Sequence, residues 1–337
     1  MDTEKWCLRI GAAAVAGAIL LRLSSGSVLG TVVEALSSPE AVAVMLYLET
    51  GRVVRPVQPQ VPDPPVQETP QETQLQDTET PTQPKEPVQA VFAPEDAALV
   101  EVNSVCGYDT DLQTLLGKPL TWDLTAQVPT VLILHTHGTE SYTKTENYTE
   151  TSSYRTLDTD YNMVSVGAEL KKVLETGGIQ VIHDTTLHDH PSYSSSYSHA
   201  RDCISEYLKK YPSIVLVLDL HRDAVENSDG TQMTFTAQVD GKKVAQLMMV
   251  VGTDANGLKH PNWQENMALA VKLHALLERS YTGICRPISF RAQRFNQDLS
   301  AGAMLIEVGS AGNTRSEALA SVRILGQTIL ELSQGTV

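Results

Sequence analysis

The sequence predicts an α/β fold with three layers, in which a mostly parallel or mixed sheet carries helices on both faces. Continuous apolar runs, typical of strands that are covered on both faces, recur through the larger, C-terminal part of the chain. Between these runs lie segments whose apolar residues recur at helical spacing. Ligands of such folds normally bind at the carboxyl ends of the strands, so the residues just after each strand are the first candidates for a site.

Four apolar runs are the expected strands, and they cover residues 131–134, 178–182, 214–218 and 303–306. Three amphipathic segments are the expected helices, and they cover residues 162–174, 266–277 and 317–332. Gly177 and Gly178 should end the first helix, because glycine commonly occupies the position after a helix C-terminus.

The composition argues against several classes of protein. The 337 residues are 42% hydrophobic and 19% charged, which is enough apolar material for a sizeable core. A net charge of -15 disfavours nucleic-acid binding and a polybasic membrane-surface binder, because both need clustered cations. Four scattered cysteines without a CxxC pair disfavour a disulfide scaffold and a thiolate zinc site. We expect Cys106, Cys203 and Cys285 to be buried free thiols.

Residues 1–51 have the pattern of an N-terminal membrane anchor region. Lys5 and Arg9 precede an apolar run over residues 10–21. The run is short against the roughly 20 apolar residues that span a bilayer, and its length also fits a signal peptide. Because no clear small-x-small cleavage site follows, we expect a retained single-pass anchor, with cleavage left open. The positive flank predicts a cytoplasmic N-terminus and an exported remainder.

Residues 52–93 are dominated by Pro, Gln, Thr and Glu. Such a segment cannot bury enough apolar surface to offset the entropy of ordering, so it is expected to be an extended linker. A globular domain over residues 94–337 follows it. An anchor, a linker and a domain are the layout of a tethered extracytoplasmic protein.

Polar side chains that bind metals or protons follow three of the expected strands. They are His135, His137 and Glu140 after the first, Asp219 and His221 after the third, and Glu307 directly after the fourth. If the strands are parallel neighbours, these groups meet at one edge of the sheet.

His137 and Glu140 form an HxxE pair, a spacing that lets two ligands converge on one ion. With His221 they would make a His₂Glu zinc site that keeps a position open for water, as in catalytic rather than structural zinc sites. Zinc lowers the pKa of bound water to about 7. Glu307, at the end of an apolar strand, is the expected general base, with a raised pKa.

Two neighbours of these ligands have more than one possible role. His135 should point to the same side of its strand as His137; it could be an alternate ligand, but we expect a partner of a ligand or a hydrogen-bonded core histidine. Asp219 could hold the ring N–H of a ligating histidine, or be a plain strand-end residue. The other histidines are expected to be solvated, with adventitious metal binding open for the His188-Asp189-His190 segment; they are His183, His188, His190, His199, His260 and His274.

Five motifs occur in a fixed order from about residue 127 to the C-terminus: VLILHTHGTESY, SSYSHARD, LVLDLHRDA, FNQDLS and MLIEVGSAGN. In these motifs, and in its anchor and stalk, the chain resembles the stage II sporulation protein P family. The resemblance implies a peptidoglycan hydrolase of endospore formers. It also implies a fold similar to zinc N-acetylmuramoyl-L-alanine amidases and, more distantly, zinc carboxypeptidases.

Carried over by motif, the essential histidines of that family fall on His137, or less favourably His135, and on His221. Its catalytic acidic residue falls on Glu307, and Glu140 takes the HxxE place.

The identity of the middle ligand stays open. Amidase relatives use a glutamate that opens the helix after the first strand, where this chain has Asp158 and Asp160, with Glu150 upstream. Glu140 is preferred because it matches the HxxE spacing.

The resemblance implies zinc-dependent cleavage of the amide between N-acetylmuramic acid and the L-alanine of the stem peptide, during engulfment. The alternatives are a cross-link endopeptidase that uses the same metal chemistry and a wall-binding module without turnover. The implied location is the space between the forespore and mother cell membranes, and the implied partners are stage II sporulation proteins D and M.

Three further residues are candidates for substrate binding. Arg222 could hold a stem-peptide carboxylate, or form an ion pair with Asp223. Asn296 and Asp298 could hydrogen-bond substrate amides, or form a capping turn before Leu299.

Overall fold

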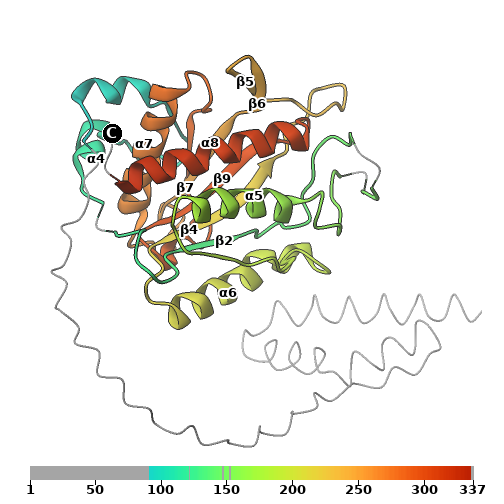
Figure 1. Cartoon of the computed structure of the whole chain (residues 1–337), viewed down its shortest axis with the longest axis horizontal. Helices are drawn as coiled ribbons and strands as arrows, with labels where there is room; N and C mark the ends of the chain where they lie inside the picture. The colour runs from blue at the N-terminus through green and yellow to red at the C-terminus, as the bar shows by residue number, and fades with distance from the viewer. Residues whose placement is uncertain (1–90, 121, 146–147, 152, 335–337) are drawn as a thin grey trace, which may run out of the picture. The chain divides into compact units, whose positions relative to one another are not determined.

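The computed structural model describes residues 91–120, 122–145, 148–151 and 153–334 (Figure 1). The predicted anchor and the predicted linker up to residue 90 lie outside these ranges. The described residues belong to one compact unit, Thr82–Val337. None of the helices in the described ranges combines the length and apolarity that a bilayer crossing requires.

A seven-stranded sheet with the order β1-β8-β7-β9-β4-β2-β3 forms the centre of the domain. Its strands are β1 (Val102–Ser104), β2 (Val131–Leu134), β3 (Val181–His183), β4 (Leu216–Asp223), β7 (Leu247–Gly252), β8 (Ile288–Arg291) and β9 (Ala303–Ser310). Neighbouring strands pair in parallel, except β7 and β9, which are antiparallel. The structure therefore confirms the predicted mostly parallel, mixed sheet.

Helices cover both faces of this sheet (Figure 1). On β2, Val131 and Ile133 join the core that contains apolar residues of α5 (Met163–Thr176) and α8 (Arg315–Gln334). The alternate residues of β2 pack in a second cluster with Ala200 and Ile204 of α6 (Ser196–Lys210). Because successive residues of a strand point to opposite faces, α6 lies on the other side of the sheet from α5 and α8. This arrangement gives the predicted three layers.

The remaining elements surround these layers. They are η1 (Pro94–Leu99), α4 (Leu112–Gly117), η2 (Tyr193–Ser195), the antiparallel hairpin of β5 (Thr236–Val239) and β6 (Lys242–Ala245), α7 (Trp263–Ser280) and η3 (Gln297–Leu299). α7 is buried along most of its length and contacts α4, α8, β7 and η1.

All three expected helices and all four expected strands are present; β2 has the expected bounds, and the other elements have shifted ends. The largest shifts are at β4 and β9, which continue past their apolar runs to Asp223 and Ser310. Pairing with each other supports these extensions, because the ladder hydrogen bonds do not depend on side-chain polarity. The sequence reasoning missed β1, β7, β8 and the β5–β6 hairpin.

The order of the central strands sets the position of the predicted site. β4 lies between β9 and β2, and all three run parallel, so their carboxyl ends meet at one edge. His221 pairs in register with Glu307, and the register of the two strands shifts between His221 and Asp223.

Candidate metal centre and active site

His137 lies in the turn after β2 and is held by aromatic contacts. Its ring stacks on Tyr193, with centroids 4.5 Å apart, and meets the ring of His221 edge-on at 5.1 Å. Its Nδ1 is buried and has no hydrogen-bond partner among the described residues. Burial, and next the charge of His221, lower the pKa of His137 to about 4. The imidazole is therefore neutral at pH 7, which is the form that binds metals.

His221, on β4, is surrounded by carboxylates. Its Nε2 lies 3.0 Å from Asp219 Oδ1, and its Nδ1 lies 3.7 Å from Glu140 Oε2. The contact between His221 Nε2 and Asp219 lacks hydrogen-bond geometry, and no other described residue forms a hydrogen bond with this Nε2. Burial acts to lower the pKa of His221, but Asp219, Glu140 and Glu307 together raise it to about 10. A cation is thus favoured at this position.

Glu307 faces this cluster from β9. The residue is half-buried, but its Oε2 is closed off from solvent and accepts no hydrogen bond from the residues that the structure describes. Burial is the main cause that raises the pKa of Glu307 to about 8; Glu140 adds to it and His221 opposes it. A carboxyl group in this state can take up and release a proton near neutral pH, as a general base must. The raised pKa expected from the sequence is therefore present.

Glu140 is brought beside His221, as the HxxE hypothesis requires. Its Oε1 accepts a hydrogen bond from Arg155 at 3.2 Å, and its Oε2 accepts one from the backbone N–H of Arg222 at 3.1 Å. The carboxylate is therefore fixed in place, with one oxygen facing the imidazole. This position suits a metal ligand, and it also suits a carboxylate that orients His221.

Asp219 connects β4 to the turn that carries His137. Its two oxygens accept hydrogen bonds from the backbone N–H of Thr136 at 2.8 Å and from the Thr136 hydroxyl at 2.6 Å. The same carboxylate contacts His221. Asp219 thus fixes the turn and the imidazole relative to each other, as a partner of a ligand would.

His135 does not share a side with His137, so that expectation was wrong. Its Nδ1 lies 3.1 Å from the carbonyl oxygen of Leu220, and its Nε2 lies 2.9 Å from Nε2 of His183. The cause is that β2 ends at Leu134, so the alternation of a strand no longer applies. His135 therefore supports the backbone beside His221 from within the core.

Arg222 makes its contacts within the protein. Its guanidinium donates to the carbonyl oxygens of Ser141 at 2.8 Å and Tyr154 at 2.7 Å, and the residue is 4% exposed. Asp223 pairs instead with Arg286, at 2.7 Å. These contacts give Arg222 a role in holding the segment around Tyr154 against β4.

Asn296 and Asp298 join η3 to α6. The Asn296 side chain donates to the carbonyl oxygen of Tyr197 at 2.8 Å. Both oxygens of Asp298 accept from the Arg201 guanidinium, at 2.9 and 2.7 Å. These contacts fit a turn, the alternative to substrate binding, since Asn296 precedes η3 directly.

Arg155 links Glu140 to a network that the sequence reasoning missed. Besides Glu140, it pairs with Asp189 at 2.7 Å, and its guanidinium lies 4.7 Å from the centroid of Tyr193, the ring that stacks on His137. No local pattern connects these residues, which come from three separate segments. Only the fold brings them together.

A compact group of metal-binding side chains lies outside the predicted set. Within the described ranges, Asp184, His188 and Cys203 are the group of three whose ligand atoms all lie within 4.8 Å of one another. The expectation that His188, His260 and His274 are solvated was wrong, since they are 4%, 2% and 2% exposed. The three described cysteines are free thiols as expected, but are half-buried rather than buried.

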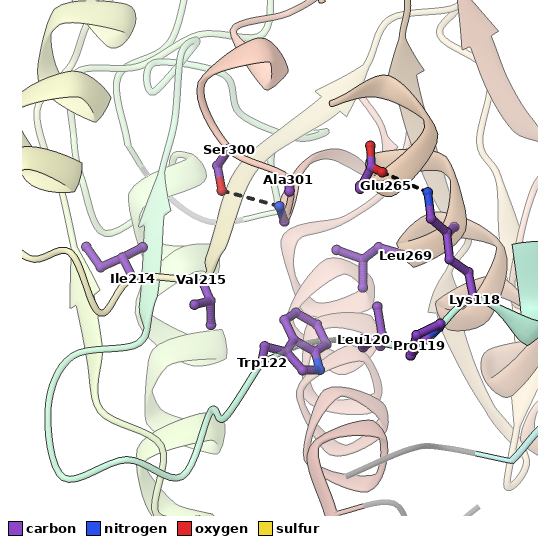
Figure 2. A pocket seen from close by; sticks show the side chains of 12 residues that line it. Lys118, Pro119, Leu120, Trp122, Ile214, Val215, Glu265, Leu269, Ser300 and Ala301 are labelled. Carbon is purple, nitrogen blue, oxygen red and sulfur yellow. Dashed lines mark hydrogen bonds and ion pairs between the residues drawn. The ribbon is translucent and has the colours of Figure 1, made fainter. Parts of the chain in front are cut away.

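The opposite edge of the sheet holds an apolar hollow of about 210 Å³ (Figure 2). Ile214 and Gly302 on its wall precede β4 and β9, so it lies at the amino ends of these strands. Trp122 and Leu269 line it, and Lys118 pairs with Glu265 at its rim (Figure 2). The hollow is therefore remote from the imidazole and carboxylate groups of the carboxyl edge.

Several known proteins are similar to this chain. The curated stage II sporulation protein P of Bacillus subtilis (strain 168) is 28% identical over 198 residues, which are 56% of this chain and 47% of the relative. The chain thus spans about half the length of that relative.

Two solved structures align with a TM-score of 0.36 each. The N-acetylmuramoyl-L-alanine amidase AmiC2 of Nostoc punctiforme is 12% identical, with 60% of this chain and 94% of that chain covered. The CwlD amidase of Clostridioides difficile, solved in complex with the GerS lipoprotein, is 14% identical, with 61% and 96% covered. The model of the stage II sporulation protein P family matches residues 49–330, and the chain therefore belongs to this family.

Proposed function

We propose that this chain is a zinc-dependent peptidoglycan hydrolase that cleaves the amide between N-acetylmuramic acid and L-alanine during engulfment. One observation carries the proposal: three of the buried side-chain atoms that lack a hydrogen-bond partner in the described part of the chain, His137 Nδ1, His221 Nε2 and Glu307 Oε2, lie at the ends of adjoining strands, at one edge of the sheet. Buried polar atoms are rarely left without a partner, and here they come from neighbouring strand ends. A metal ion and its water would satisfy these atoms.

The donor set fits zinc. Two imidazoles and a carboxylate are the ligands of many catalytic zinc sites, and His137 is already in its neutral form. His137, His221 and Glu140 would hold the ion. Glu140 is buried beside His221, whereas Asp158 is exposed, which favours Glu140 as the middle ligand. When bound, zinc supplies hydroxide at neutral pH by lowering the pKa of its water to about 7.

The residues of the chain supply the remaining parts of the mechanism. Glu307 takes the proton of the attacking water on its buried Oε2 and passes it to the leaving L-alanine nitrogen. Its raised pKa lets it hold that proton between the two steps. Asp219 holds the turn that carries His137 through its hydrogen bonds with Thr136, and Tyr193 stacks on the His137 ring.

The family and the predicted anchor support a location at the membrane. We infer that the domain acts on the wall between the forespore and mother cell membranes, with stage II sporulation proteins D and M as partners. Purification of the full chain from sporulating cells tests this inference, because stage II sporulation protein D or M should co-purify with it. If neither protein co-purifies, the inference is contradicted.

Mass spectrometry of purified sacculi digested by the full chain tests the proposed reaction. Glycan strands without peptides, together with free stem peptides that begin at L-alanine, are expected. A chelator should abolish their release, and added zinc should restore it. Intact stems with broken cross-links would instead show the endopeptidase, and wall binding without products would show a binding module.

A further inference from the structure

We propose that Asp184, His188 and Cys203 form a second site for a divalent transition-metal ion such as zinc. Asp184 follows β3 directly, His188 lies in the same loop and Cys203 lies on α6. Their ligand atoms all lie within 4.8 Å of one another. This inference does not depend on the proposed hydrolase function, because none of its residues belongs to the candidate active site.

The distances within the group are close to those of a metal site. His188 Nε2 lies 2.8 Å from Asp184 Oδ2, and Cys203 Sγ lies 3.3 Å from the same oxygen. Ligand atoms at about 2.0–2.3 Å from a tetrahedral zinc ion are roughly 3.3–3.8 Å apart. Side-chain movements of about half an ångström would therefore accommodate an ion.

The chemistry of the donors favours a borderline-soft ion. One thiolate, one imidazole and one carboxylate suit zinc or cobalt better than calcium or magnesium, which prefer oxygen ligands. The missing CxxC pair disfavours a thiolate site by sequence, but these ligands come from a loop and a helix that only the fold brings together.

The surroundings leave room for an ion and place a further histidine, His199, near the group. A cavity of about 580 Å³ adjoins the group, and its wall includes His199, Asp202 and Glu206. His199 and Cys203 are four residues apart on α6, so they share a face of that helix. The carboxylates of Asp202 and Glu206 outweigh the one lysine of the wall, Lys210, and this net negative charge favours a cation.

An ion here would stabilise the loop that supports the candidate active site. Asp189, next to His188, accepts hydrogen bonds from Thr139 and Arg155, and Arg155 in turn holds Glu140. Fixing His188 to α6 would therefore fix the position of Asp189. We assign the site a structural role on this basis.

Cobalt substitution of the full chain tests the proposal. The metal-free protein, loaded with Co²⁺ alone, should show the near-ultraviolet charge-transfer absorption that a thiolate ligand produces. Cys203→Ser should lose this band and His188→Gln should weaken it. Cys106→Ser, the matched control at another half-buried thiol, should keep it. His137→Ala should also keep the absorption band, because the candidate active site has no thiolate. The experiment therefore tests the second site independently of the proposed hydrolase function.

Absence of the band, or a band that survives Cys203→Ser, would overturn the proposal and leave only a hydrogen-bonded cluster. A second measurement on the unmutated protein covers the case in which a variant does not fold. Added zinc should slow alkylation of Cys203 at least tenfold while that of Cys106 is unchanged. Equal alkylation rates with and without zinc would contradict the site.

Discussion

The two edges of the sheet differ in what they bury, although β4 and β9 contribute to both. At the carboxyl edge, the described residues bury imidazole and carboxylate atoms that have no hydrogen-bond partner, on His137, His221 and Glu307. At the amino edge, an apolar hollow of about 210 Å³ is lined by side chains such as Trp122 and Leu269. The hollow offers mainly apolar walls, whereas the polar edge carries side chains that can bind a metal ion or a proton. We therefore place the candidate site at the polar edge rather than at the hollow.

The largest effect is expected at the carboxyl edge from His221→Ala. This variant should lose the zinc bound at that edge and, with it, all measurable hydrolysis, because a ligand is removed. Metal analysis together with the sacculus assay measures both. His190→Ala, a change to an exposed histidine, is the matched control and should retain metal and activity. Unchanged zinc content in His221→Ala would refute its assignment as a ligand.

Glu307→Gln separates the base from the ligands. It should keep the zinc content of the unmutated protein but hydrolyse the wall about 10²–10⁴-fold more slowly, because the amide cannot take up the proton. Single-turnover digestion beside metal analysis checks this. If the variant lost metal, Glu307 would be a ligand and the base would have to be reassigned.

Leu269→Ala tests the amino edge. Leu269 is 2% exposed, so its truncation should lower the free energy of unfolding by about 2–4 kcal/mol. The activity of the folded fraction should not change, since the hollow is remote from Glu307. Urea unfolding and the sacculus assay give the two values. Lost activity without lost stability would move function to this edge.

Asp298→Asn is expected to have the smallest effect. Burial acts to raise the pKa of Asp298, but the Arg201 guanidinium overrides it and lowers that pKa. The pair thus stabilises the fold above the ordinary aspartate pKa of about 3.9, and this contribution is lost as pH falls through the lower, folded value. Because Arg201 is partly exposed, we expect only about 1 kcal/mol at pH 7.

Unfolding midpoints from pH 7 to pH 2 check this last expectation: unmutated protein and variant should converge in acid. A variant with full stability but lost hydrolysis would instead assign Asp298 to substrate binding, as the sequence allowed.

Much of the fold could be predicted because local patterns determine it. The apolar runs before His135, Asp219 and Glu307 predict parallel strands, and parallel strands bring the residues at their carboxyl ends to one edge of the sheet. The antiparallel β7 and the extensions of β4 and β9 could not be predicted, since they depend on pairing between distant segments.

The candidate site also has a part that the sequence predicts and a part that it does not. His137, Glu140 and His221 could be selected from residue type and position, and the fold places both His137 and Glu140 beside His221. Three features could not be predicted: the direction of the His135 side chain, the contact of Arg155 with Glu140, and the Asp184–His188–Cys203 group. Each depends on contacts across loops, and loops have no repeating sequence pattern.

Anomalous diffraction at the zinc edge from crystals of the zinc-loaded protein tests the central claim most directly. We expect an ion about 2.0–2.1 Å from one nitrogen each of His137 and His221, with the Glu307 carboxylate nearby but not bound to it. Zinc-loaded crystals without an anomalous peak between these two imidazoles would contradict the account.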